Sequence, residues 1–327
     1  MFGEKPRGRA SQAQARRARI GRQSADRAHL GVLRLLALAV LAVVALIGWE
    51  TLRGALPAMR AFGWRFLLST DWDPVAEKFG ALPYLYGTVV SSALALLLAL
   101  PLGLGTAVYL AELAPRKVAS AVAFVVELLA AIPSIVYGLW GLFVLAPFLR
   151  TAVEPRLIAH LGFLPLFHGF PFGIGMLNAA LVLAVMIVPT IVSISREVLG
   201  SMPSSLREAA LALGATRAEA IAVTLDAARP GILGAVILAL GRAIGETMAV
   251  TMVIGNTNRI SASLLAPGST MASVIANEFT EAAGKLYLSA LIEIALVLLA
   301  LTLVVNAGAR LLVIRTTGGR RDVAGAA

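Results

Sequence analysis

Cysteine is absent from the 327 residues, histidine is rare and charge is scarce. The missing cysteines exclude disulfide bonds, thiolate metal ligands and a cysteine nucleophile. His29, His160 and His168 are scattered along the chain and indicate no metal cluster. Charged residues make up 14% of the chain, whereas an ordinary soluble domain carries about 25%. A water-soluble core of this size would therefore lack the polar surface to cover it.

Apolar residues are what the chain has in excess: 59% of it is hydrophobic, and the mean hydropathy is +0.86. The charges gather at the two ends and between long apolar blocks. This arrangement is typical of a bundle of membrane-spanning helices. The net charge of +10 then reflects membrane topology and not nucleic-acid binding, because the basic residues flank apolar spans and are not interleaved with stacking aromatics.

Six segments are apolar enough to cross a membrane as helices of about 20 residues. The expected spans are residues 32–49, 86–110, 118–149, 176–195, 232–255 and 287–309. The third segment is too long for one simple span and too short for two. Because Pro133 removes a backbone donor inside it, we expect one kinked span and then an interfacial or re-entrant piece that leads into the phenylalanine-rich residues 163–172.

The lysines and arginines predict the orientation of an all-α polytopic membrane domain at residues 31–313. With the N-terminus in the cytoplasm, 18 of the 28 basic residues lie on the cytoplasmic side and eight on the outer side, so both termini are expected to be cytoplasmic. We expect residues 1–30 to be a disordered basic arm and residues 314–327 a cytoplasmic tail. The first span is not read as a secretory signal, since the arm is long and no small-residue cleavage site follows.

The segment 196–231, between the fourth and fifth spans, predicts a short helix, a glycine break and a second helix. Ser205-x-x-Glu208 is a capping-box pattern, in which a hydroxyl and a carboxylate satisfy free amides at a helix start. Gly214 is a typical helix terminator. An ordinary helical connection between spans would have the same features.

A second capping pattern, Thr216-x-x-Glu219, starts the helix that we expect to end near Pro230. With its glycine break, the loop resembles the EAA loop of ABC-importer permeases, which in that family forms a coupling helix that docks on the ATPase subunit. The residues that match this motif, and to which the resemblance gives the coupling role, are Glu208, Ala209, Ala210 and Gly214.

Ionisable residues inside the apolar spans are the candidates for a translocation pathway, since a charge at mid-membrane costs roughly 2.5–3.5 kcal/mol and usually has a function. Arg242 and Glu246 lie four residues apart in the fifth expected span, so we expect them to share one helix face and attract each other. An arginine there suits an oxyanion, because its planar fork donates two parallel hydrogen bonds. An ion pair that only fixes helix rotation is the alternative. Glu127 and Glu293 are further candidates, each with a structural hydrogen bond as its alternative.

Longer stretches around these residues resemble the PstC-type permeases of the bacterial phosphate ABC transporter, over roughly residues 70–312. The matching stretches are Gly241-Arg-Ala-Ile-Gly-Glu-Thr-Met-Ala-Val-Thr251, Ile254-Gly-Asn-Thr257, Glu127-Leu-Leu-Ala-Ala-Ile-Pro-Ser-Ile-Val-Tyr-Gly-Leu-Trp-Gly141, Tyr86-Gly-Thr-Val and Asn277-Glu-Phe-Thr-Glu281. The sister PstA-type permeases have a similar Arg-x-x-x-Glu stretch but differ after Glu-Thr.

The resemblance implies a multi-pass subunit of the bacterial plasma (inner) membrane that imports phosphate together with other proteins. Its expected partners are a PstA-type permease, two ATPase subunits, a periplasmic phosphate-binding protein and the lipid bilayer. The chain has no Walker A pattern and no convincing catalytic residues, so ATP and Mg are expected on the partner ATPase and no cofactor on this chain. The alternatives to this function are a permease for sulfate or molybdate, the PstA-type sister subunit, a secondary transporter and a structural scaffold.

Overall fold

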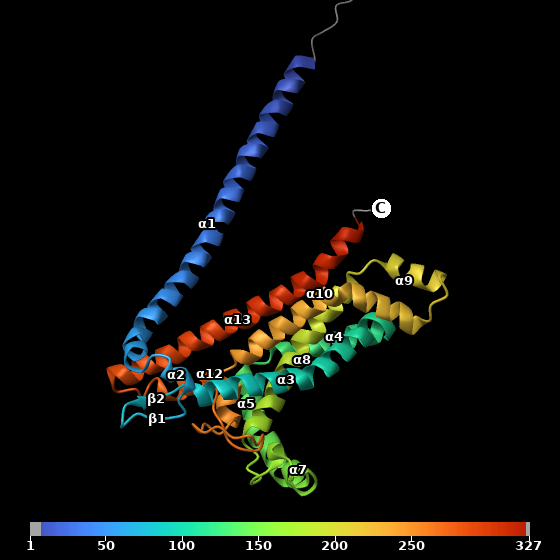
Figure 1. The fold of residues 1–327 in the computed structure, drawn as a ribbon. Coiled ribbons are helices and arrows are strands. Elements are labelled where there is room, and N and C mark those ends of the chain that lie inside the picture. Colours follow the sequence, from blue (N-terminus) through green and yellow to red (C-terminus); the bar gives the residue numbers. More distant parts are fainter. Residues whose placement is uncertain (1–7, 325–327) are drawn as a thin grey trace, which may run out of the picture. The chain divides into compact units, whose positions relative to one another are not determined.

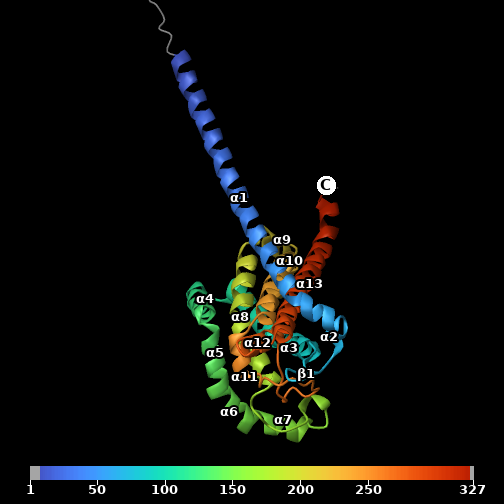
Figure 2. The same ribbon diagram turned by 90° about the vertical axis from the view of Figure 1, so that its left-hand side faces the viewer.

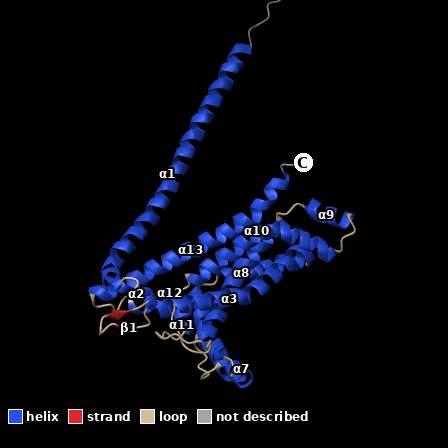
Figure 3. Cartoon of the chain, viewed as in Figure 1, coloured by secondary structure: helices blue, strands red, loops and turns tan. Residues whose placement is uncertain are grey.

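The computed structural model describes the backbone of residues 8–324 and the side chains of residues 30–311, 313 and 314. This part of the chain is mostly helical, and its one antiparallel hairpin pairs Trp72 with Phe79 (Figures 1 and 3). The elements are α1 (Gly8–Phe62), α2 (Arg65–Leu68), β1 (Trp72–Asp73), β2 (Lys78–Phe79), α3 (Leu82–Val108), η1 (Tyr109–Leu113), α4 (Arg116–Ala131), α5 (Ser134–Trp140), η2 (Gly141–Leu145), α6 (Ala146–Phe148), η3 (Leu149–Val153), α7 (Glu154–Leu161), η4 (Pro165–Phe167), α8 (Met176–Gly200), α9 (Ser204–Ala212), α10 (Arg217–Ile244), α11 (Met248–Val253), α12 (Met271–Glu278) and α13 (Lys285–Ala324).

The chain divides into two compact units, Met1–Arg53 and Gly54–Ala327. The first unit contains the first part of α1, whose backbone is helical from Gly8, where the sequence predicts a disordered arm. The arginine, alanine and glutamine of this segment are good helix formers. Residues 1–7 and 325–327, at the ends of the predicted arm and tail, lie outside the described residues. The second unit contains every other described element.

Six of the described helices are long and apolar enough to cross a membrane, which is the number expected. They are Leu30–Phe62, Leu82–Leu113, Ser134–Leu161, Met176–Gly200, Arg217–Ile244 and Lys285–Leu311. The third span begins only after Pro133 and runs to Leu161, so the expectation of one kinked span over residues 118–149 was wrong. Ile132 and Pro133 are extended, with ψ of 129° and 140°, and separate α4 from α5 completely. The residue before a proline avoids the helical conformation, which explains a full break in place of a kink.

The central helix of the second unit is α8, which packs against α3, α4 and α10 (Figures 1 and 2). Close helix crossings depend on glycine: a Cβ on Gly103 would lie 2.8 Å from a methyl carbon of Ile191, and one on Gly138 would lie 2.9 Å from the Ala249 Cα. Small residues at such crossings let helix backbones approach where lipid supplies no hydrophobic driving force. α7 and α9 lie at opposite ends of this unit in both views.

The fifth span differs from its prediction at both ends. α10 runs straight through Pro230, where a helix end was expected, and its 28 residues extend for about 42 Å. A Cβ on the neighbouring Gly231 would lie 2.5 Å from Val198 of α8, so close packing holds the helix together at this point. At the other end, residues 245–247 break the helix between α10 and α11, where one continuous span to residue 255 was expected.

One of the two predicted capping boxes is present. The Thr216 side chain accepts from the Glu219 amide at 3.4 Å, and the Glu219 carboxylate accepts from the Thr216 amide at 2.7 Å. The box predicted at Ser205 and Glu208 was wrong, because α9 begins two residues earlier than that box requires, at Ser204, and has no side-chain cap. Pro203, whose missing amide needs no partner, precedes the helix instead.

Candidate functional site

The break between α10 and α11 interrupts a span in the middle of the apolar sequence. Gly245 and Glu246 donate only long backbone hydrogen bonds, of 3.3 and 3.4 Å, to the last turn of α10. The Glu246 carboxylate accepts from the Ala249 amide at 3.3 Å, so it satisfies a free donor at the start of α11. Irregular backbone at membrane depth occurs where it is enclosed by protein or lines a water-filled cavity. This break is therefore a natural place for a polar site.

Arg242 lies in the last turn of α10, directly before the break, and its side chain is exposed. A cation at this position is favoured by the free carbonyl groups of a helix C-terminus. The expected ion pair with Glu246 was wrong: among the described side chains, no carboxylate lies within 4.0 Å of the Arg242 guanidinium. The helix break explains this result, because residues 242 and 246 no longer share one helix face.

Tyr137 packs near the same break, and sequence reasoning gave it no role. Its side chain is 7% exposed and belongs to the core cluster that contains Ala243 of α10 and Ala249 of α11. Its hydroxyl donates to the Leu129 carbonyl at 2.7 Å, across the break between α4 and α5. Pro133 lacks the amide that would otherwise bond this carbonyl four residues back. The sequence offered one signal for Tyr137: because Pro133 has no amide to donate, a nearby hydroxyl was to be expected as a donor to the Leu129 carbonyl.

Glu127 and Glu293 lie elsewhere, and no described hydrogen bond or ion pair joins either of them to Arg242. Glu127 is on α4 and lines a cavity of about 530 Å³ that also contains Arg196 and Glu197 of α8. Glu293 is on α13, where it is 6% exposed and has one buried carboxylate oxygen without a hydrogen-bond partner among the described residues. The four predicted pathway residues therefore occupy three separate places.

The α9 segment presents the predicted coupling residues. Glu208 and Ala209 are exposed, whereas Ala210 is buried against the second unit. Gly214 follows with φ of +86°, a conformation that glycine adopts without strain. Leu213, beside it, is 90% exposed and offers an apolar side chain to a partner.

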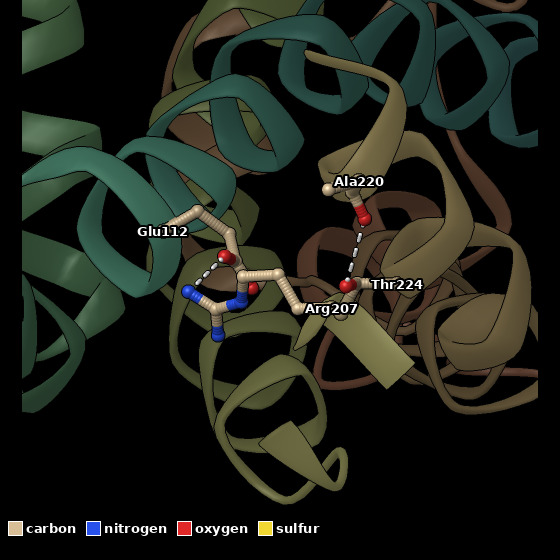
Figure 4. A network of polar contacts seen from close by, with 4 residues as sticks. All are labelled: Glu112, Arg207, Ala220 and Thr224. Atoms are coloured by element: carbon tan, nitrogen blue, oxygen red, sulfur yellow. Dashed lines mark hydrogen bonds and ion pairs between the residues drawn. The ribbon is translucent and has the colours of Figure 1, made fainter. Parts of the chain in front are cut away.

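Arg207, also on α9, forms an ion pair that the sequence did not predict. Its Nη1 lies 2.9 Å from Oε2 of Glu112, whose side chain is only 2% exposed (Figure 4). Close by, the Thr224 hydroxyl donates to the Ala220 carbonyl within α10 at 3.1 Å. Glu112 was overlooked because the second span was expected to end at residue 110, two residues before it. In the structure that helical run continues to Leu113.

Within the described residues, no group of three or more histidine, aspartate or glutamate side chains is arranged to hold a metal ion. The candidate sites described above can therefore interact with a solute through single charges, hydroxyl groups and exposed backbone groups.

Comparisons with known proteins identify the family of the chain. Residues 99–318 match the family described as binding-protein-dependent transport system inner membrane component. The phosphate transport system permease protein PstC of Mesorhizobium japonicum is 50% identical over 267 residues, which are 80% of this chain and 82% of the relative. The PstC of Haemophilus influenzae is 44% identical over 80% of this chain and 84% of the relative.

Among solved structures, a chain of the MetNI methionine ABC transporter in an inward-facing conformation superposes with a TM-score of 0.55. That match has 20% sequence identity and covers 71% of this chain and 94% of the other, so it identifies a shared fold only. Because the family model covers most of the described membrane helices, the chain belongs to the binding-protein-dependent transport system inner membrane components and, among them, to the PstC-type permeases.

Proposed function

We propose that this chain is the permease subunit of an ATP-driven phosphate importer and forms half of its translocation pathway. The observation that carries the proposal is the identity of 42 to 50% with permeases named for phosphate transport, each over at least four-fifths of the relative's length. Similarity of this extent includes the segment around Arg242, where an oxyanion would need a cation.

Arg242 is the residue that we assign to phosphate. Its side chain is exposed beside a helix break, so the guanidinium can reach a solute without first leaving an ion pair. A guanidinium donates two parallel hydrogen bonds to a phosphate, and an anion entering a low-dielectric pathway needs such a partner. Tyr137, which packs in the same core cluster as Ala243, has a phenol whose proton is already engaged with Leu129. Conduction also requires that the anion leave again, which a single cation permits.

Three carboxylates complete the proposed pathway. Glu246 keeps the break open by capping α11 and places negative charge near Arg242. Glu127 lines the cavity at the α9 end of α8 together with Arg196 and Glu197, and we assign this cavity to the later part of the pathway. Glu293 is buried, so its pathway role requires α13 to move during transport.

The α9 loop is the proposed dock for an ATPase subunit. Glu208, Ala209, Ala210 and Gly214 form the docking motif, and the exposed Leu213 adds apolar contact area. The loaded binding protein would dock at the α7 end, and closure of the ATPases would push on α9 and re-orient the spans. ATP and Mg are held by the ATPase subunits, and this chain contributes no catalytic residue to hydrolysis.

The assembled importer contains a PstA-type permease, two ATPase subunits and a periplasmic phosphate-binding protein in the bacterial inner membrane. Both termini of this chain are cytoplasmic, because this orientation puts 18 of the 28 basic residues inside. Residues 31–313 are the membrane domain in this proposal, and residues 1–30 and 314–327 its cytoplasmic ends.

Competition between oxyanions tests the proposed substrate. The complex of this chain with its partners is reconstituted in proteoliposomes, and ATP-driven uptake of radiolabelled phosphate is measured with excess unlabelled phosphate, sulfate or molybdate. We expect unlabelled phosphate alone to suppress uptake. Suppression by sulfate or molybdate at equal concentration would favour a permease for another oxyanion, and uptake without the ATPase subunits would favour a secondary transporter.

A further inference from the structure

α9 packs against α10, but few of its side chains are buried there. Of its described residues only Ala210 is buried. Arg207 makes the one ion pair recorded between α9 and another element of the described chain, with Glu112 at 2.9 Å. The Glu112 side chain is 2% exposed, whereas Arg207 is 43% exposed and reaches inward from the surface. A buried carboxylate is stable only with such a partner, so this contact is specific in both position and charge.

Glu112 belongs to a joint between two helices. η1 ends α3 with a π-helical turn, in which the Ala114 amide donates to the Tyr109 carbonyl at 2.8 Å. Ala114 and Pro115 are then extended, with ψ of 139° and 143°, before α4 begins. Two extended residues beside a π-turn are a joint at which α4 can change its angle to α3, and π-turns inside helices often accompany function. A force on Glu112 therefore acts at this joint.

The other end of α4 reaches the proposed phosphate site. The Leu129 carbonyl accepts from Tyr137, which packs in one core cluster with Ala243, the neighbour of Arg242 in α10. α5 also crosses α11 closely, since a Cβ on Gly138 would lie 2.9 Å from the Ala249 Cα. The ion pair, α4 and this packing thus connect α9 to the break after α10. Both ends of α4 are flanked by extended, proline-containing breaks, so α4 can move as one body.

We propose that the Arg207–Glu112 ion pair transmits movement of α9 to α4, and through α4 to Tyr137 and Arg242. Arg207 and Glu112 are then positioning residues for coupling and do not touch phosphate or ATP. The inference rests on the proposed function, in which α9 receives the push of an ATPase subunit. Coupling through a contiguous network has to be demonstrated by a measured energetic link between its members.

The test measures phosphate imported per ATP hydrolysed by the complete complex in proteoliposomes. Arg207→Gln and Glu112→Gln are each expected to lower this ratio by roughly tenfold, within the usual range of coupling between sites. ATP hydrolysis and co-purification of the ATPase subunits should persist. The exchanged pair, Arg207→Glu with Glu112→Arg, should recover part of the ratio. Arg229→Gln is the matched control, because it removes an exposed ion pair with Asp226 inside α10 and should leave the ratio unchanged.

A covalent bridge tests the same link without depending on how well these variants fold. The chain has no cysteine, so Arg207→Cys with Glu112→Cys gives one defined thiol pair. We expect a complex bridged by a reducible bifunctional thiol reagent to import phosphate, and cleavage of the bridge inside assembled proteoliposomes to lower the ratio. Wild-type complex treated with the same reagents is the control.

The outcomes separate the inference from the proposed function. If wild-type complex imports phosphate but both single variants keep its import per ATP, or if cleaving the bridge changes nothing, the link between α9 and α4 is refuted while the importer stands. If wild-type complex shows no ATP-driven phosphate uptake, the proposed function itself fails.

Discussion

Gly214 is held in the left-handed region, with φ of +86°, in the turn between α9 and α10. A Cβ added here would meet no atom within 4 Å, so backbone strain is the whole steric cost of a substitution. Left-handed backbone costs a residue with a Cβ roughly 1–2 kcal/mol. Gly214→Ala should therefore loosen the turn and lower the fraction of complexes that retain the ATPase subunits during purification.

Two other glycines serve as controls for this prediction. Gly63 also has a positive φ, of +54°, and Gly234 lies inside α10; an added Cβ meets nothing within 4 Å at either position. Gly63→Ala should carry a similar strain, and Gly234→Ala should carry none, but neither should affect retention of the ATPase. Equal retention in the Gly214→Ala variant and in wild type would show that this turn does not position the dock.

The sequence predicted which single residues are candidates for the pathway, but not which partners they contact. The rarity of charge in the apolar spans identified Arg242 and Glu246, but their pairing was assumed from helical spacing that the break removes. Glu112 and Tyr137 were overlooked for a different reason. Glu112 pairs with Arg207, 95 residues away along the chain, and Tyr137 packs in one core cluster with Ala243, 106 residues away. Spacing along a sequence carries no information about such contacts.

At the scale of elements, apolar runs located all six spans, because about 30 Å of hydrocarbon requires a long uninterrupted helix. The ends of the helices were harder. The box at Thr216 was predicted because both of its hydrogen bonds are local. The box at Ser205 failed because the helix has Pro203 as its N-cap and begins two residues earlier than expected, which takes Ser205 out of the capping position.

Two prolines show why the breaks could not be read from local sequence. Pro133 ends a helix, and the Leu129 carbonyl accepts from the Tyr137 hydroxyl as well as from the Ile132 amide. Pro230 lies within α10, which packs tightly against α8 at the next residue, Gly231. Each proline removes one backbone donor. Whether the helix continues is then decided by packing against other helices.

At the scale of the whole molecule, the proposed orientation can be tested with single cysteines on a cysteine-free chain. Val75 and Leu213 are 96% and 90% exposed, so cysteines there should react readily. With cytoplasmic termini, Val75→Cys faces outward, and an impermeant maleimide should label it in intact cells. Leu213→Cys should be labelled only after permeabilisation. The opposite labelling pattern would invert the topology and place the proposed ATPase dock outside the cell.

The chain combines a six-span fold shared with ABC importer permeases, a helix break that carries an exposed arginine, and a short helix whose Arg207 pairs with the buried Glu112 at one end of the bundle. The fold is common to permeases for unlike solutes, so the substrate depends on the site. The central claim is therefore that ATP drives phosphate past Arg242.

The measurement that tests this claim most directly is ATP-driven phosphate uptake by proteoliposomes, with the wild-type complex compared with Arg242→Gln and with the control Arg229→Gln. The account predicts uptake that needs ATP and the binding protein, is kept by the control and falls roughly tenfold or more in Arg242→Gln, since a hydrogen bond to a charged group contributes about 1.5–3 kcal/mol. Uptake by Arg242→Gln at the wild-type rate would contradict the pathway role of this arginine, and absence of phosphate uptake by the wild-type complex would contradict the account as a whole.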